Sequence, residues 1–369
     1  METLTQSNVG QNPPTRVMLV DDSAVIRGMI ARWILEAGGF EVVCTASNGR
    51  MAVDMVERYK PEIVLLDIEM PEVDGLAALP LILKSHPGCK VIVISTLTKR
   101  NAQVSLKCLS LGAVDYLAKP ESARAADAAM VFRRDLMDKL RALSAAKPRP
   151  ARQVPATAQM PARPAHPILP KPAQVRPQCL LIGSSTGGPR AVERVLQDLK
   201  PVLARIPVLI VQHMPPMFTA VFAEHLQGLL SVPCREAKDG ETVDAGTILV
   251  APGNRHMGIS ATPGKPVIRL NDGPQENFCR PAVDVLFREA ASVFGPAAIA
   301  AVLTGMGADG TAGARHLVKA GATIIAQDEA TSIVWGMPGS VVKAGLAHDV
   351  LPLDAIGRSL AGLITGTSR

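Results

Sequence analysis

The chain has 369 residues and a formal net charge of +6, which is long enough for two domains that each bury a core. Its six cysteines form no C-x-x-C pair, which argues against a zinc or disulfide framework and is typical of reduced core residues in a cytoplasmic protein. Aromatic residues make up only 3% of the chain, too few for a nucleic-acid surface built on base stacking. No apolar run has transmembrane length, and the polar segment 1–15 predicts a disordered tail.

The excess positive charge lies in one segment, residues 145–177. Its six basic residues account for the whole net charge of the chain, and it has no acidic residue: Lys147, Arg149, Arg152, Arg163, Lys171 and Arg176. Nine prolines and no aromatic residue predict an extended linker, in which His166 is a solvated side chain. Because a folded nucleic-acid-binding domain carries a basic patch of its own, we expect no nucleic-acid partner.

Apolar runs alternate with helix-period segments between residues 16 and 144. Strands are expected at Val17–Val20, Val42–Thr45, Ile63–Leu66, Val91–Ile94 and Tyr116–Ala118. Helices are expected to begin near Ser23, Gly49, Gly75 and Lys99, with a closing helix around Ala123–Leu143. This alternation predicts a doubly wound parallel α/β sheet, whose ligand site lies at the carboxyl ends of its strands.

Polar side chains stand at those predicted strand ends: Asp21 and Asp22, Asp67, Ser95 and Lys119. Clustered carboxylates suit a hard cation such as Mg²⁺, and a lysine suits a phosphoryl group. Any single aspartate here is as typical of a helix cap or a solvated loop end. Five such groups at the ends of four strands favour a functional site.

This domain closely resembles response-regulator receiver domains, which have a flavodoxin-like fold. The matching motifs are V-D-D-S at Val20–Ser23, L-L-D-I-E-M-P-E-V-D-G at Leu65–Gly75, I-S-T at Ile94–Thr96 and A-K-P at Ala118–Pro120. The resemblance implies that Asp67 accepts a phosphoryl group from a histidine kinase. It also implies that Asp21, Asp22, Asp67 and the backbone of Glu69 hold Mg²⁺, that Ser95 and Lys119 contact the phosphoryl oxygens, and that Tyr116 occupies an aromatic switch position.

A second α/β rhythm begins at Gln178. The apolar run Cys179–Ile182 enters a glycine-rich turn, and Pro189 is expected at the first position of the following helix. Further strands are expected at Val208–Gln212, Ile248–Ala251, Ala298–Leu303 and Thr323–Ala326. A strand, a glycine-rich turn and a helix N-terminus are typical of two devices: a phosphate cradle, or a nucleophilic serine beside an oxyanion site.

The turn lacks the G-K-[ST] of a P-loop and the G-x-G-x-x-G of a dinucleotide site, but it contains G-x-S-x-G through Gly183, Ser185 and Gly187. By itself, a serine in such a turn is as typical of a helix cap as of a nucleophile. His213 and Asp309 also follow predicted strands, so a parallel sheet would bring the three loops to one edge. The order Ser, His, Asp differs from that of α/β-hydrolases. His213 as a strand cap, Asp309 as a helix N-cap and His256 as the base remain alternatives.

Residues from about Gln178 to Ser368 resemble the catalytic domain of chemotaxis protein-glutamate methylesterases, and a receiver followed by this domain is itself typical of that family. The matching motifs are I-G-S-S-T-G-G-P at Ile182–Pro189, Q-H-M at Gln212–Met214, A-P-G-N-R-H-M at Ala251–Met257, R-P-A-V-D-V-L-F at Arg280–Phe287, L-T-G-M-G-A-D-G at Leu303–Gly310 and G-M-P at Gly336–Pro338. The resemblance implies a Rossmann-like α/β domain over 178–369. Within it, Ser185 is the nucleophile, His213 the base, Asp309 its orienting partner, and the N–H groups of Thr186 and Met306 are the oxyanion donors.

The resemblance further implies a two-component response regulator in the cytoplasm. As a hydrolase, it demethylates glutamate methyl esters and deamidates glutamines on chemoreceptor helices. Phosphorylation of Asp67 relieves a block by the receiver, Mg²⁺ serves only the receiver, and no cofactor serves the catalytic domain. We expect a monomer that does not insert into the membrane. The rival from another class is a non-catalytic response regulator whose second half docks on a partner after phosphorylation; a DNA-binding output domain is disfavoured, since no helix-turn-helix pattern follows Gln178.

Overall fold

The protein is described by a computed structural model that covers residues 13–119, 126–145, 168–170, 175–262 and 265–367. The chain divides into two compact units, each built on its own sheet. Most of the segments 1–15 and 145–177, including His166, lie outside the described residues, so the expected tail and linker stay predictions. The described parts contain no helix long and apolar enough to cross a membrane.

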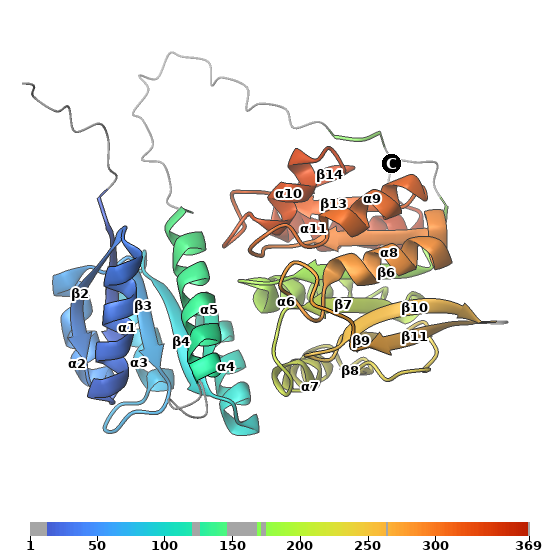
Figure 1. Ribbon diagram of the computed structural model, residues 1–369. Coiled ribbons are helices and arrows are strands. Elements are labelled where there is room, and N and C mark those ends of the chain that lie inside the picture. Colours follow the sequence, from blue (N-terminus) through green and yellow to red (C-terminus); the bar gives the residue numbers. More distant parts are fainter. Residues whose placement is uncertain (1–12, 120–125, 146–167, 171–174, 263–264, 368–369) are drawn as a thin grey trace, which may run out of the picture. The chain divides into compact units, whose positions relative to one another are not determined.

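The first unit is a five-stranded parallel sheet with the order β2-β1-β3-β4-β5 (Figure 1), which confirms the predicted architecture. Asp67 is the last residue of β3 and Lys119 the last of β5, whereas Ser95 lies one residue before the end of β4. Between residues 15 and 145 the elements are, in chain order, β1 Thr15–Val20, α1 Ala24–Ala37, β2 Phe40–Ala46, α2 Gly49–Tyr59, β3 Ile63–Asp67, α3 Gly75–Ser85, β4 Lys90–Thr96, α4 Lys99–Leu111, β5 Asp115–Lys119 and α5 Ala126–Ala145.

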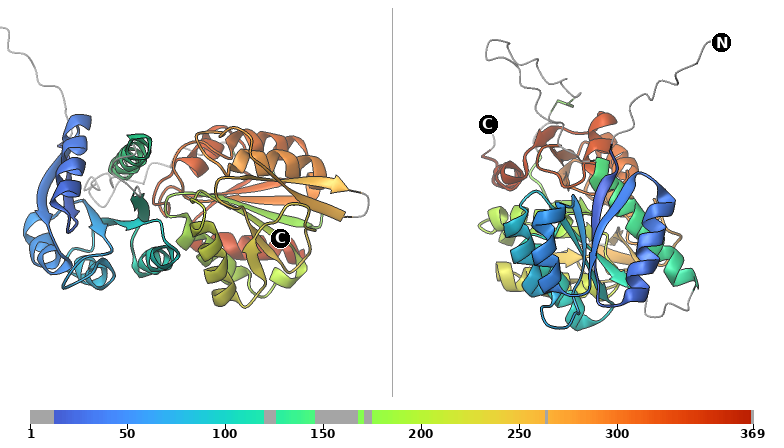
Figure 2. Two further views of the ribbon diagram at one scale, coloured as in Figure 1. Left: turned by 60° about the horizontal axis from the view of Figure 1, so that its bottom comes forward. Right: turned by 90° about the vertical axis from the view of Figure 1, so that its left-hand side faces the viewer.

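The second unit is a seven-stranded parallel sheet with the order β14-β13-β12-β6-β7-β9-β8. Helices α6, α7 and α11 cover one face, and α8, α9 and α10 cover the other (Figure 2). Its elements are β6 Cys179–Ser184, α6 Gly188–Leu199, η1 Leu203–Arg205, β7 Val208–Gln212, α7 Phe218–Leu230, β8 Cys234–Glu236, β9 Ile248–Val250, β10 His256–Thr262, β11 Lys265–Asn271, α8 Val283–Phe294, η2 Gly295–Ala297, β12 Ala298–Val302, α9 Thr311–Lys319, β13 Thr323–Gln327, α10 Met337–Lys343, β14 Asp349–Leu351 and α11 Leu353–Thr365.

Helix α6 shows how the sequence builds the edge of this sheet that carries the site. Its apolar stripe is buried as predicted, at Ala191, Val192, Val195, Leu196 and Leu199. The predicted start is wrong by one residue, because Gly188 is the first helical residue and Pro189 the second. Gly187 caps the helix with a φ of 75°, a left-handed conformation that glycine adopts without steric cost. Proline fits either position, since neither N–H has a partner within the helix.

Four strands of the second unit are absent from the sequence-based expectation: β8, β10, β11 and β14. Strands β10 and β11 form an antiparallel hairpin separate from the main sheet, whereas β8 and β14 are three-residue strands at its two edges. Such short edge strands contain too few residues for an apolar alternation to show. The hairpin ends at Asn271, and residues 272–282 connect it to α8.

Candidate active site

The two sheets reverse their strand order at defined points, and in such folds ligands bind beside the carboxyl ends of the strands at that reversal. In the second unit the chain runs from β6 to β7 on one side and later returns to β12 on the other side of β6. Ser185 follows β6, His213 follows β7, and Asp309 lies in the loop after β12. All three therefore stand at the same edge of the sheet.

Ser185 lies in a turn that the surrounding backbone fixes closely. Its N–H donates to the Thr304 carbonyl oxygen at 3.1 Å, and its own carbonyl oxygen accepts the Gly188 N–H at 2.8 Å. A Cβ on Gly305 would lie 2.9 Å from the Cβ of Ser185, so only glycine allows this approach. The Ser185 side chain is partly exposed, and its hydroxyl has no hydrogen-bond partner among the described residues. It is therefore open to an incoming group.

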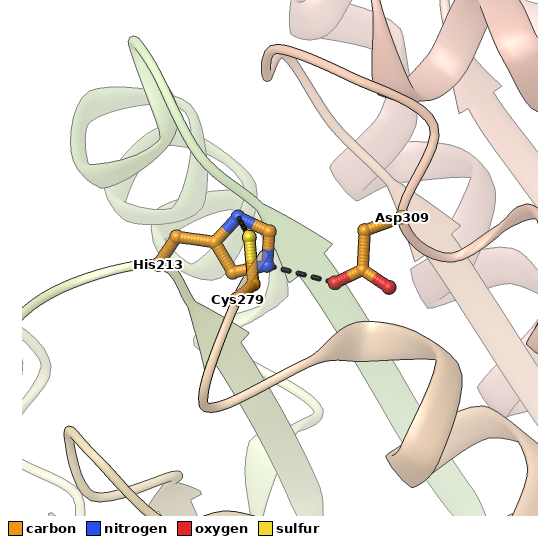
Figure 3. Close-up of side chains that lie close together, drawn as sticks. All are labelled: His213, Cys279 and Asp309. Atoms are coloured by element: carbon orange, nitrogen blue, oxygen red, sulfur yellow. Dashed lines mark hydrogen bonds and ion pairs between the residues drawn. The ribbon is translucent and has the colours of Figure 1, made fainter. Parts of the chain in front are cut away.

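His213 and Asp309 are in direct contact. The His213 Nε2 lies 2.8 Å from the Asp309 Oδ2 (Figure 3), and the Asp309 side chain is almost fully buried. The backbone N–H of His213 donates to the Ser184 carbonyl oxygen at 3.2 Å, which keeps His213 beside the Ser185 turn. Nε2 donates to the carboxylate, and the contact that the structure gives to Nδ1 among the described residues is with the Cys279 Sγ at 3.5 Å, not with Ser185.

Asp309 stays charged although burial disfavours its charge. Its carboxylate accepts the His213 Nε2 and the backbone N–H groups of Val283, Asp284 and Gly310, at 2.6, 3.0 and 2.9 Å for the three backbone donors. These donors outweigh the burial and hold the pKa of Asp309 below its usual value. Val283 and Asp284 are the first two residues of α8, so the N-terminus of that helix contributes to stabilising the charge.

Helices α8 and α9 cap each other through two aspartates. Asp309, which precedes α9, accepts the first N–H groups of α8; Asp284, within α8, accepts the Gly313 N–H of α9 at 2.6 Å. Asp309 was expected to be either a helix cap or a partner of His213. In the structure it contacts His213 and also caps a helix, but that helix is α8 and not α9, which follows it in the chain. Burial, followed by the nearby negative charge of Asp309, raises the pKa of Asp284.

Cys279 also belongs to this cluster, although no sequence motif singled it out. Its Sγ lies 3.5 Å from the His213 Nδ1 (Figure 3). Burial lowers the pKa of His213, but the contacts with Asp309 and Cys279 outweigh it and raise that pKa above its ordinary 6.5. His213, Cys279 and Asp309 also form a group with metal-ligand atoms within 4.8 Å of one another, although both Asp309 oxygens are already held by N–H donors.

The backbone of residues 304–306 carries the donor predicted for an oxyanion. The Met306 N–H donates to no acceptor among the described residues, and Met306 is partly exposed. Thr186 is buried at the start of the Ser185 turn, where its carbonyl oxygen accepts the Thr304 hydroxyl at 2.9 Å. This bond ties the turn to the end of β12, the strand that leads to Met306.

The two adjacent serines have different environments. The Ser184 side chain is fully buried and its hydroxyl donates to the Gln212 Oε1 at 2.7 Å. The Gln212 Nε2 in turn donates to the Ser185 carbonyl oxygen at 3.0 Å. Ser184 and Gln212 therefore hold the turn from its buried side. Of the two serines, only Ser185 is partly exposed.

His256, the alternative candidate for the base, is occupied at both ring nitrogens. Its Nε2 lies 2.9 Å from the Pro274 carbonyl oxygen, and its Nδ1 accepts the Ala282 N–H at 3.2 Å. The side chain is buried. These partners fix one neutral tautomer and leave His256 no nitrogen with which to accept a proton from Ser185.

In the first unit, the predicted residues gather at the reversal between β1 and β3. The Lys119 Nζ lies 2.8 Å from both Asp21 Oδ2 and Asp67 Oδ2. Burial raises the pKa of Asp67 to about 6, against the opposing effect of Lys119, and the two carboxylates raise the pKa of Lys119 despite its burial. Ser95 and Tyr116 are buried, and burial raises the pKa of Tyr116 well above its ordinary value.

The same three aspartates fit a hard cation. One carboxylate oxygen from each of Asp21, Asp22 and Asp67 lies within 4.8 Å of the others, and oxygen atoms are the ligands that Mg²⁺ prefers. Asp22 is exposed, so the cluster opens to solvent on that side. The Glu69 side chain accepts the Thr96 hydroxyl at 3.3 Å, which leaves the predicted role of its backbone untouched.

Comparison with known proteins supplies the family. The family model described as CheB methylesterase matches residues 180–360, and that of the response regulator receiver domain matches residues 17–130. A protein-glutamate methylesterase/protein-glutamine glutaminase of Rhodopseudomonas palustris strain BisB5 is 48% identical and covers 96% of both chains. The relative of the same name from strain HaA2 is 49% identical over 97% of this chain and 96% of its own.

The chain belongs to the CheB methylesterase family. The solved catalytic domain of Thermotoga maritima CheB methylesterase is 41% identical, covers 51% of this chain and all of that one, and has a TM-score of 0.48. Like the named relatives, this chain is a hydrolase with a response-regulator receiver domain, and the resemblance drawn from the sequence motifs is confirmed. The rival interpretation, a response regulator whose second half only binds a partner, is wrong.

Proposed function

We propose that this enzyme hydrolyses glutamate methyl esters and deamidates glutamines on chemoreceptor helices in the cytoplasm, with Ser185, His213 and Asp309 as its catalytic residues. The observation that carries the proposal is the contact of His213 with Asp309 at 2.8 Å beside a turn that exposes the Ser185 hydroxyl. The names of the relatives, protein-glutamate methylesterase/protein-glutamine glutaminase, support the substrate class.

In the proposed reaction, the Ser185 Oγ attacks the ester carbonyl carbon while the His213 Nδ1 takes its proton. The charged Asp309 holds Nε2–H and stabilises the imidazolium that forms. The N–H groups of Met306 and Thr186 stabilise the oxyanion. Imidazolium then protonates the departing methanol, or ammonia when the substrate is a glutamine, and a water molecule releases the acyl group by the same steps in reverse order.

We further propose that a histidine kinase phosphorylates Asp67 and that this raises the rate of hydrolysis. Asp21, Asp22 and Asp67 would hold Mg²⁺, which supplies positive charge to the transferred phosphoryl group. Lys119, within 2.8 Å of Asp67, is placed to bind the phosphoryl oxygens. Ser95 is buried at the end of β4 and would contact the same group.

The decisive test compares the two adjacent serines. Ser185→Ala removes the nucleophile and is expected to lower methanol release from methylated receptors by about 10⁴-fold or more, with phosphorylation of Asp67 intact. Ser184→Ala removes only the hydrogen bond to Gln212. It is expected to lower the free energy of unfolding by roughly 1 kcal/mol and to leave methanol release nearly unchanged. Equal rates in Ser185→Ala and the parent enzyme would exclude Ser185 as the nucleophile.

A further inference from the structure

One tight turn carries several of the contacts around His213. Residues Glu276 and Cys279 exchange backbone hydrogen bonds, with the Glu276 N–H donating at 3.1 Å and the Cys279 N–H at 2.9 Å. Asn277 and Phe278 between them have φ values of 52° and 62°. A two-residue loop with both φ values positive is the type I′ geometry, in which Asn followed by Gly is the preferred pair. Phe278 therefore occupies a position where a bulky side chain is disfavoured.

The other side chains of this turn and of the next residue are held by the protein. The Asn277 Nδ2 donates to Asp284 and Asp309 at 2.8 and 3.1 Å, and Cys279 contacts His213. Glu276 pairs with Arg288 through two bonds of 2.8 and 3.1 Å. The Arg280 guanidinium donates to the Asp272 and Gly273 carbonyl oxygens and to Asn254 Oδ1. The turn is thus fixed against the site on both sides.

Phe278 is the exception. Its side chain carries no polar atom and is 81% exposed. Phe278 directly precedes Cys279, whose Sγ contacts the His213 Nδ1. Because consecutive Cα atoms lie about 3.8 Å apart, Phe278 is close to the candidate base. The chain therefore presents a large apolar ring to solvent, in a strained conformation, at the rim of the candidate active site. Strain kept at such a place points to a function.

We infer that Phe278 is a substrate-contacting residue that packs against apolar side chains flanking the glutamyl ester. The inference rests on the proposed function. A glutamyl side chain is short, so an ester that reaches Ser185 brings the polypeptide around it against the rim. A rigid aromatic ring on a fixed turn buries apolar area there at little entropic cost. Contact with the polypeptide, and not with the ester group, predicts an effect on KM for the protein substrate alone.

Phe278→Asn separates this role from a structural one, because asparagine suits the positive φ that phenylalanine does not. We expect the variant to melt at a higher temperature, yet to show a KM about tenfold higher for a methylated receptor fragment, with kcat within about twofold. Hydrolysis of p-nitrophenyl acetate, which has no polypeptide, is expected to stay unchanged. Phe278→Leu, which keeps an apolar side chain, is expected to restore most of the low KM.

Ser231→Asn is the matched control. Ser231 also has a positive φ, 57°, but it ends α7, which starts beside the site and runs to the opposite edge of the sheet. We expect its KM to equal that of the parent enzyme. An unchanged KM in Phe278→Asn, or a parallel loss of p-nitrophenyl acetate hydrolysis, would overturn the inference while leaving the proposed function standing. A parent enzyme that hydrolyses p-nitrophenyl acetate but releases no methanol from receptors would overturn both.

Discussion

Two buried aspartates, Asp67 at the end of β3 and Asp309 in the loop after β12, show opposite shifts of pKa. Burial raises the pKa of Asp67 to about 6. Lys119 opposes this rise, but its ammonium group is shared with Asp21, whose negative charge also disfavours the ionised form of Asp67. The pKa of Asp309 is lowered, because His213 and three backbone N–H groups bind the carboxylate. The pKa of the same side chain at the same kind of sheet edge is thus shifted in opposite directions by its surroundings. Asp67 therefore ionises less readily than an ordinary aspartate, whereas the donors around Asp309 keep it charged.

The largest expected difference between the two sites is in methanol release when each aspartate is replaced singly by asparagine. Asp309→Asn keeps the shape but loses the charge that fixes the His213 tautomer, so we expect methanol release to fall by about 10⁴-fold. Asp67→Asn is expected to leave the basal rate within a few fold and to abolish only the stimulation by a small phosphodonor. Rates with and without phosphodonor for both variants provide the measurement. A loss of basal activity in Asp67→Asn as large as that in Asp309→Asn would contradict the separation.

His256→Ala tests whether His256, the other candidate for the base, is structural. Loss of its ring leaves the Ala282 N–H buried without an acceptor, which we expect to lower the free energy of unfolding by roughly 1–3 kcal/mol. Below the melting temperature, kcat is expected to fall less than tenfold, whereas His213→Ala is expected to abolish turnover. Thermal melts and kcat of the two variants decide the matter. If His256→Ala were as inactive as His213→Ala at full stability, His256 would belong to the catalytic machinery.

The smallest expected effect concerns pH. Contacts with Asp309 and Cys279 outweigh burial and raise the pKa of His213 to about 10, so its neutral, proton-accepting form increases as the pH rises toward that value, and activity is expected to increase with it. Cys279→Ala removes one of the two raising contacts. The acid limb of the kcat/KM profile is therefore expected to move to lower pH, while Ser184→Ala leaves it in place. A limb that stays where it was in Cys279→Ala would show that the thiol does not act on His213.

The sequence was sufficient for those parts of both sites that follow from strand ends. In a parallel sheet, a residue directly after a strand is placed by the strand itself, which is why Asp21, Asp67 and His213 could be located from the apolar runs before them. The helix starts near Ser23, Gly49 and Gly75 were found for a similar local reason: Ser23, Asn48 and Asp74 each accept an N–H of the first turn.

The sequence was insufficient where a contact depends on packing between distant segments. Asn277 lies 32 residues before Asp309, and Cys279 lies 66 residues after His213, with no strand to relate them. Their signal was at most their place just before the R-P-A-V-D-V-L-F motif at Arg280–Phe287. The residue pattern also left the choice between His213 and His256 open, because each follows a predicted strand. In the structure His256 is the first residue of β10, and its hydrogen-bond partners differ from those of His213.

The reciprocal capping of α8 and α9 has a consequence for how the enzyme reaches its working state. Asp309 accepts N–H groups from α8, and Asp284 accepts one from α9, so neither helix start is complete until the two helices have docked. The carboxylate that contacts His213 therefore has its full set of donors only once the two helices have docked. A partly folded chain can possess every catalytic residue and still have no oriented base. The rate of ester hydrolysis during refolding is thus expected to follow helix docking, and to lag behind the recovery of secondary structure.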